Sequence, residues 1–172
     1  MPYIWKTLRT LLKPCAFAVR TMKSNKLEIH AAMQIQKPII EVFEAIVNPD
    51  KMSNYFISKS TGKMEEGKEL IWNFPEFDFD CPVRIGKIIT NEYISYYWQM
   101  DNLELFVEMK LTERENNSTL VSITEKSRDN DEAGLKWLSS NSFGWSNFLA
   151  CLKAYLEYGI NLRKGAFTFM KK

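Results

Sequence analysis

Few of the residue types that carry out enzyme chemistry occur in this 172-residue sequence at spacings that would bring them together. His30 is the single histidine, so a Ser–His–Asp or Cys–His site would have to use it. It falls on the polar side of an alternating segment, and the sequence contains no G-x-S-x-G nucleophile motif. We therefore interpret His30 as a solvent-facing or structural residue, and the sequence favours no catalytic residue.

Metal-binding groups are equally sparse. Cys15, Cys81 and Cys151 share no C-x-x-C or zinc-finger spacing, and an odd, scattered set of thiols is typical of a reducing compartment. The three acids of "PEFDFD", residues 75–80, alternate with phenylalanines. They could bind a cation or a basic partner, or keep a loop or strand edge soluble, and we favour the second interpretation. The sequence predicts no metal, no cofactor and no disulfide.

Large aromatic side chains are the remaining chemical signal, with 5 Trp, 7 Tyr and 11 Phe in the chain. Alternation in strand-like segments and a spacing of three or four in the last long segment place many of them on inward faces. Such residues build either a packed core or a ligand-binding pocket, and the sequence leaves both open. The candidate ligand-binding residues are Trp72, Phe74, Tyr96, Trp98, Val107, Met109, Phe148, Leu149, Leu152 and Tyr155.

The elements that must position these residues follow a clear order. Residues 27–35 alternate as a strand, and the segment around Pro38 and Ile46 has the spacing of a short helix that Pro49 ends. Five further strand patterns run from 68 to 126 with short connections, as in an antiparallel meander. A short helix is expected around 132–138, and a long amphipathic helix over 142–162, about 31 Å in length. This order predicts an α+β domain in which the long C-terminal helix covers a curved antiparallel sheet.

The first 21 residues differ in charge from the rest of the chain. Four basic residues and no acidic residue precede Met22, so removing this segment changes the formal charge from +2 to −2. We expect residues 1–21 to be a basic extension or to follow an upstream start codon, with the domain spanning 22–172; a membrane-surface arm or a targeting peptide is the alternative. The near-neutral domain has no basic stripe for nucleic acid, and no segment has the roughly 20 apolar residues that stable membrane insertion needs.

Four segments carry a resemblance to a known family: "IQKPIIEVFEAIVNPDKMSNYF", "GKIITNEYISYYW", "STLVSITEK" and "GWSNFLACLKAYLE". In this order and spacing, from about Leu27 to Leu162, they resemble the bacterial type of the heat-shock-protein-90 ATPase activator homologue family. That family belongs to the START, polyketide cyclase and birch-pollen-allergen-like (SRPBCC) superfamily. The resemblance implies a helix-grip fold, with two short helices after the first strand and an apolar cavity under the long helix. Co-chaperone activity is not implied, because the separate chaperone-binding domain of the eukaryotic proteins has no counterpart here.

The favoured function is non-enzymatic binding or carriage of a small hydrophobic or aromatic molecule in that cavity. One alternative is a cyclase- or hydrolase-like enzyme that uses Arg84, Glu108 or a tyrosine as acid or base. The other is a chaperone-associated interaction protein. We expect a cytoplasmic protein, monomeric or homodimeric, whose partner is a small hydrophobic molecule.

Overall fold

A computed structural model describes residues 25–76, 79–100 and 103–170 of the chain. The domain boundary expected at Met22 lies outside the described residues.

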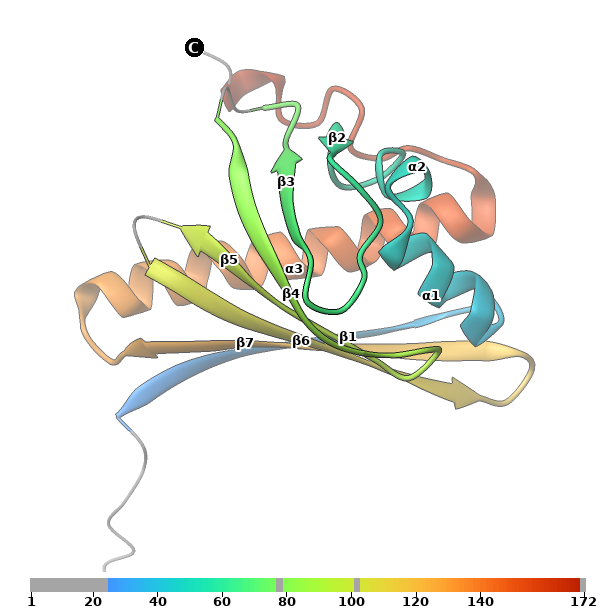
Figure 1. Ribbon diagram of the computed structural model, residues 1–172, viewed down its shortest axis with the longest axis horizontal. Helices are drawn as coiled ribbons and strands as arrows, with labels where there is room; N and C mark the ends of the chain where they lie inside the picture. The colour runs from blue at the N-terminus through green and yellow to red at the C-terminus, as the bar shows by residue number, and fades with distance from the viewer. Residues whose placement is uncertain (1–24, 77–78, 101–102, 171–172) are drawn as a thin grey trace, which may run out of the picture.

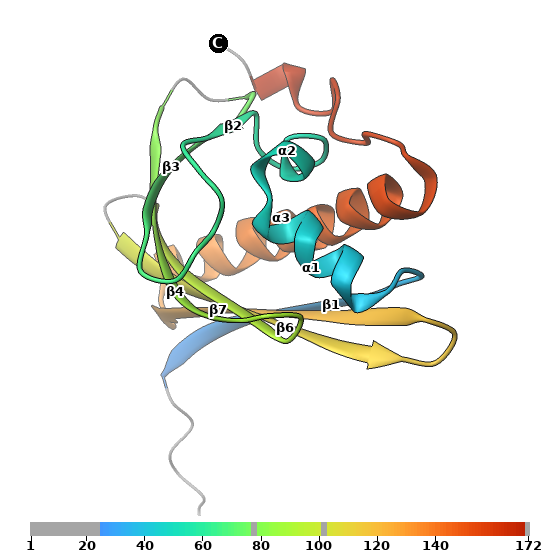
Figure 2. The ribbon, with the colours of Figure 1, turned by 45° about the vertical axis from the view of Figure 1, so that its right-hand side comes forward.

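One antiparallel sheet of seven strands forms the body of the protein (Figure 1). The strands are β1 (Lys26–Ile35), β2 (Lys59–Ser60), β3 (Glu69–Asn73), β4 (Cys81–Ile89), β5 (Tyr93–Met100), β6 (Leu103–Arg114) and β7 (Ser118–Asp129). They lie in the order β1-β7-β6-β5-β4-β3-β2, so β2 to β7 make a meander and β1 pairs with its last strand. The sheet is strongly curved, and one side of it is concave (Figures 1 and 2).

Two short helices, α1 (Ile39–Val47) and α2 (Pro49–Met52), connect the two edges of the sheet, as the family resemblance implied. Pro38 precedes the first turn of α1, and the Asn48 side chain accepts a hydrogen bond from the Asp50 amide at the start of α2. A 3-10 turn, η1 (Thr168–Met170), follows the last helix. No described helix has the length and apolar character needed to cross a membrane.

The C-terminal helix α3 spans Glu132–Tyr158 without a break, about 40 Å at 1.5 Å per residue. The expected division into a short helix and a second helix over 142–162 is wrong. Residues 139–142 are weak helix formers, but packing of Trp137 and Trp145 on the sheet outweighs that preference. Gly159 ends the helix earlier than expected, because it adopts a left-handed conformation with φ of 67°.

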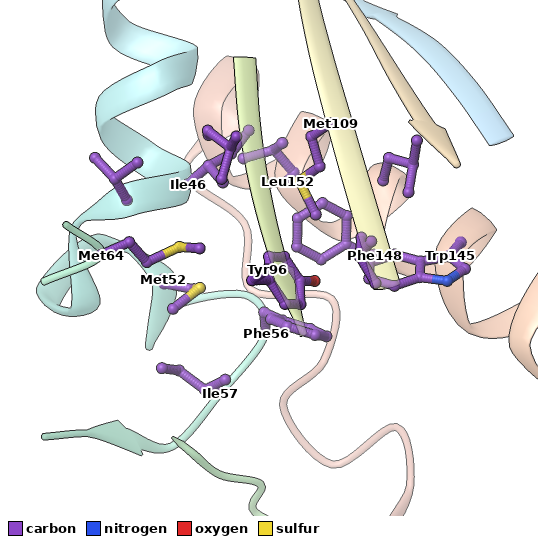
Figure 3. Packing of buried hydrophobic residues seen from close by; sticks show 14 of the residues in the cluster. Ile46, Met52, Phe56, Ile57, Met64, Tyr96, Met109, Trp145, Phe148 and Leu152 are labelled. Carbon is purple, nitrogen blue, oxygen red and sulfur yellow. The ribbon is translucent and has the colours of Figure 1, made fainter. Parts of the chain in front are cut away.

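Helix α3 lies across the concave face of the sheet and contacts β1 and β7 (Figure 2). The alternation predicted for the strands is confirmed: Ile94, Tyr96 and Trp98 of β5 are all buried. The same is true of alternate residues of β3 and β6. Together with α1 and α3 they form one hydrophobic core, part of which Figure 3 shows around Tyr96, Met109, Phe148 and Leu152. The helix-grip α+β architecture expected from the sequence is therefore confirmed.

Candidate functional site

A pocket of about 240 Å³ lies at one end of the domain, beside the N-terminal half of α3. Its other walls come from the ends of β3, β4 and β5, from the loop after α2, and from the segment that follows α3. Figures 1 and 2 show how that C-terminal segment returns to the end of the sheet where β2 and β3 lie. Four parts of the chain that are distant in sequence therefore meet at one pocket.

Aromatic rings dominate the lining: Phe56, Phe74, Phe79, Trp98, Phe143, Trp145 and Phe167. The ring centroids of Trp98 and Trp145 lie 5.5 Å apart, and those of Phe56 and Phe74 lie 5.3 Å apart with nearly perpendicular planes. Phe79 and Phe143 are 49% and 64% exposed, so the mouth of the pocket is apolar as well. Such a lining favours apolar and aromatic ligands.

A buried carboxylate lies behind the residues that line the pocket, and one layer of side chains separates it from the open space. Glu125 of β7 is fully buried, and its Oε1 accepts a hydrogen bond of 2.9 Å from Trp98 Nε1. Its Oε2 accepts bonds of 3.0 Å from Asn141 Nδ2 and from Trp145 Nε1. Burial raises the pKa of Glu125, and the three N–H donors counteract part of that rise. The carboxylate thus joins β5, β7 and α3 behind the pocket.

An ion pair holds the C-terminal segment to the opposite wall. Arg163 Nη2 lies 2.7 Å from Glu76 Oε2, and the side chains are only 15% and 5% exposed. The guanidinium carbon also lies 5.0 Å from the centre of the Phe167 ring, which lines the pocket. Because the pair is charge-balanced and buried, it closes this side of the pocket without giving it a net charge.

Cys81 lines the pocket with a thiol. Burial raises its pKa to about 11, so the group is a neutral thiol at physiological pH. Neither Cys81 nor Cys151 forms a disulfide.

Of the ten candidate ligand-binding residues, the pocket brings together two, Phe74 and Trp98. The others lie in the packed core: Trp72, Tyr96, Val107, Met109, Phe148, Leu149 and Leu152 are each 2% exposed or less. Tyr155, on the far half of α3, is partly buried and stacks on Tyr55 with centroids 5.7 Å apart. The concave face beneath the C-terminal half of α3, around Phe148 and Leu152, is thus filled by side chains, and open space remains beside residues 140–147.

The polar residues considered for chemistry lie away from the pocket. Arg84 is on the outer face of β4, where it pairs with Glu104 at 2.8 Å. Glu108 accepts from Lys126 and from the Tyr93 hydroxyl on the outer face of β6. His30 is exposed and lies 3.2 Å from Thr124 Oγ1. Among the described residues, no group of three His, Cys, Asp or Glu side chains could hold a metal ion.

Sequence reasoning missed Glu125, Arg163 and the residues of α3 before Trp145. It favoured a solubilising role for the acids of residues 75–80, which is wrong for Glu76, because that carboxylate is buried and pairs with Arg163. Glu125 did leave a signal, because it alternates in phase with the inward residues Val121 and Ile123 of the same strand. The pairing of Glu76 with Arg163 left none, since the two are 87 residues apart.

Known proteins with this architecture are numerous among solved structures. The protein SSP2350 from Staphylococcus saprophyticus is 31% identical, with a TM-score of 0.71 over 80% of this chain and 96% of its own. The Aha1 dimer from Colwellia psychrerythraea is 17% identical, with a TM-score of 0.67 over 77% and 98% of the two chains. CalU16 from Micromonospora echinospora is 19% identical, with a TM-score of 0.61 over 77% of each. The curated proteins contain no match.

A family model matches most of this chain. The model described as "Activator of Hsp90 ATPase homolog 1-like protein" matches residues 36–157, from the end of β1 to the last turn of α3. This range includes Trp98, Glu125 and Trp145 but stops before Arg163 and Phe167, which complete the pocket. The chain belongs to the family of Activator of Hsp90 ATPase homolog 1-like proteins.

Proposed function

We propose that the protein binds or carries a small, uncharged, largely aromatic molecule in the pocket between the N-terminal half of α3, the ends of β3 to β5 and the C-terminal segment. The observation that carries the proposal is a pocket of about 240 Å³ whose lining is mainly aromatic, next to a core that is otherwise filled.

The volume limits the size of the ligand. A dry apolar cavity of about 150 Å³ can hold benzene, and sites for drug-sized molecules begin at about 300 Å³. A pocket of about 240 Å³ therefore suits a ligand of one or two fused rings. Part of a longer molecule could extend through the mouth, past Phe79 and Phe143.

The charges around the pocket favour an uncharged ligand. Arg163 and Glu76 neutralise each other, and Glu125 is separated from the open space by Trp98, Asn141 and Trp145. An ion in this pocket would lose its hydration without gaining an unpaired partner of opposite charge.

The same groups favour binding over catalysis. The Cys81 thiol, with a pKa raised to about 11, is not activated as a nucleophile. Glu125 has its two oxygens engaged by three donors behind the pocket lining. A cytoplasmic location is part of the proposal, and the free thiols of Cys81 and Cys151 support it. A homodimer like that of the Colwellia protein is one of the two oligomeric states that we expect.

The proposal can be tested by NMR with the isotope-labelled protein and 2-methoxynaphthalene, a neutral two-ring probe. Saturable shifts are expected for the backbone amides of Asn141, Gly144 and Arg163, which line the pocket. The amides around Leu152, in the core, are expected to move little. The absence of saturable shifts, or shifts centred on Leu152, would contradict a ligand site beside residues 140–147 of α3. Native mass spectrometry of the protein from its own host then identifies a retained molecule.

A further inference from the structure

The pocket is lined by one amide whose orientation is set by a hydrogen bond to a buried residue outside the lining. Asn141 lines the pocket, and its Nδ2 donates a hydrogen bond of 3.0 Å to Oε2 of the fully buried Glu125. When Glu125 is ionised it can only accept hydrogen bonds, so the Asn141 amide presents its Nδ2, and not its oxygen, to Oε2. The orientation of an asparagine amide is often ambiguous, but here the partner decides it.

The two indoles contribute no N–H to a ligand. Trp98 Nε1 and Trp145 Nε1 donate to Glu125 at 2.9 and 3.0 Å, so these side chains offer the pocket their rings. The carboxylate therefore engages the N–H of both indoles and one N–H of the Asn141 amide. Of the polar atoms of Trp98, Trp145 and Asn141, the amide oxygen of Asn141 is the one still able to bind a ligand. It accepts no hydrogen bond from the described residues.

From this arrangement we infer that Asn141 is a specificity-determining residue, held in place by Glu125, and that the ligand is a small aromatic molecule carrying a hydrogen-bond donor such as a phenolic hydroxyl or an arylamine. The inference rests on the proposed function and names the class of ligand. Glu125 acts as a positioning residue, since it does not line the pocket itself.

The other polar side chains considered for ligand contact do not give the same selection. The Ser140 hydroxyl also lines the pocket, but it can both donate and accept and so serves a hydroxyl and an ether alike. Arg163 is paired with Glu76, and its Nε is buried without a partner among the described residues. The amide oxygen of Asn147 accepts a weak hydrogen bond from Cys151 Sγ at 3.5 Å. The amide nitrogen of Asn147 is therefore the group that can bind a ligand, as a donor. A donor of this kind serves hydroxyl and ether oxygens alike. The Asn141 oxygen discriminates between them, because an ether has no hydrogen to donate.

The test is a comparison of two probes of similar shape, 2-naphthol and 2-methoxynaphthalene. The full-length protein is titrated with each probe, and binding is followed by calorimetry. We expect 2-naphthol to bind at least about tenfold more tightly, the factor that a net hydrogen bond of about 1.4 kcal/mol gives. The two variants Asn141→Leu and Glu125→Gln are expected to bring the ratio of the two dissociation constants to within about threefold. Leucine removes the acceptor, and glutamine can donate to Asn141 and so allows its amide to turn.

The ratio of the two dissociation constants distinguishes a role of Asn141 in ligand recognition from a role in folding. A variant that only loosens the pocket weakens both probes together and leaves their ratio unchanged. Asn147→Leu is the matched control, and it is expected to keep the tenfold preference. If both probes bind the native protein equally, the inference is overturned while the proposed function stands. If neither probe binds the native protein, the inference and the proposed function are both overturned. If Asn141→Leu keeps the preference for 2-naphthol, the role of Asn141 is refuted.

Discussion

Gly144 lies in the middle of α3 and lines the pocket, and its replacement by leucine tests the position of the open space. A Cβ added there would meet no heavy atom within 4 Å. The new side chain therefore extends into space that is empty of protein atoms. In the packed core under the same helix, an equal gain in volume would force neighbouring atoms to move.

The expected changes in stability and in binding have opposite signs. Glycine inside a helix is about 0.8–1.0 kcal/mol less favourable than alanine, and leucine is close to alanine. Gly144→Leu should thus raise the free energy of unfolding by about 0.5–1 kcal/mol, or the melting temperature by about 1–4 °C at this chain length. Gly144 is an exposed residue of the pocket lining, so the leucine side chain is expected to narrow the pocket from its open side.

Urea denaturation and calorimetric titration with 2-methoxynaphthalene measure the two effects on the same sample. The expected result is a more stable protein whose affinity for the probe is at least about tenfold lower. Ser139→Leu is a suitable control, because Ser139 is an exposed residue of α3 outside the pocket. A loss of stability in Gly144→Leu would show that the space is filled, and unchanged affinity would show that the probe binds elsewhere.

Three further outcomes are expected. Leu152→Trp should lower the free energy of unfolding in urea by about 1–3 kcal/mol, because Leu152 is fully buried in the packed core; no loss would reveal a hidden cavity beneath the C-terminal half of α3. Burial raises the pKa of Glu125 above 4.5, so its contribution to stability is complete below pH 4.5 and is lost as the pH rises through the folded-state pKa. The unfolding free energy of the native protein, measured relative to that of Glu125→Gln, should therefore fall over this pH range by up to about 1.4 kcal/mol for each pH unit, and a flat profile would contradict this. Removal of residues 1–21 should lower the melting temperature by only a few degrees, and a drop above about 8 °C would refute the boundary at Met22.

Local pattern was enough to predict most of the fold. Alternation with a period of two placed Leu105, Val107 and Met109 on the inner face of β6, and all three are buried. The uninterrupted course of α3 was not predictable in this way. Propensity favours a break at Ser139–Ser142, and the contacts that maintain the helix, such as Asn141 with Glu125, come from a distant strand.

The aromatic character of the pocket was predictable from the sequence, but its position in the fold was not. The aromatic content indicated rings that line a cavity, yet the same rings also pack a core, and sequence does not tell which of them meet a partner. Phe148 meets Tyr55, Phe56 and Trp145, so no space remains beside it. Where the space is left depends on how far the C-terminal segment returns toward the sheet, which the buried pair of Glu76 and Arg163 determines.

The match to the family model ends at residue 157, whereas Arg163 and Phe167 form one side of the pocket. Because this side is built after the last helix, an exchange of about ten residues at the end of the chain would reshape the binding space and leave the sheet and its core untouched. Ligand identity can therefore diverge between relatives much faster than their matched domains do. Inference of a ligand from one relative to another requires a comparison of these tails, whatever the identity over the shared domain.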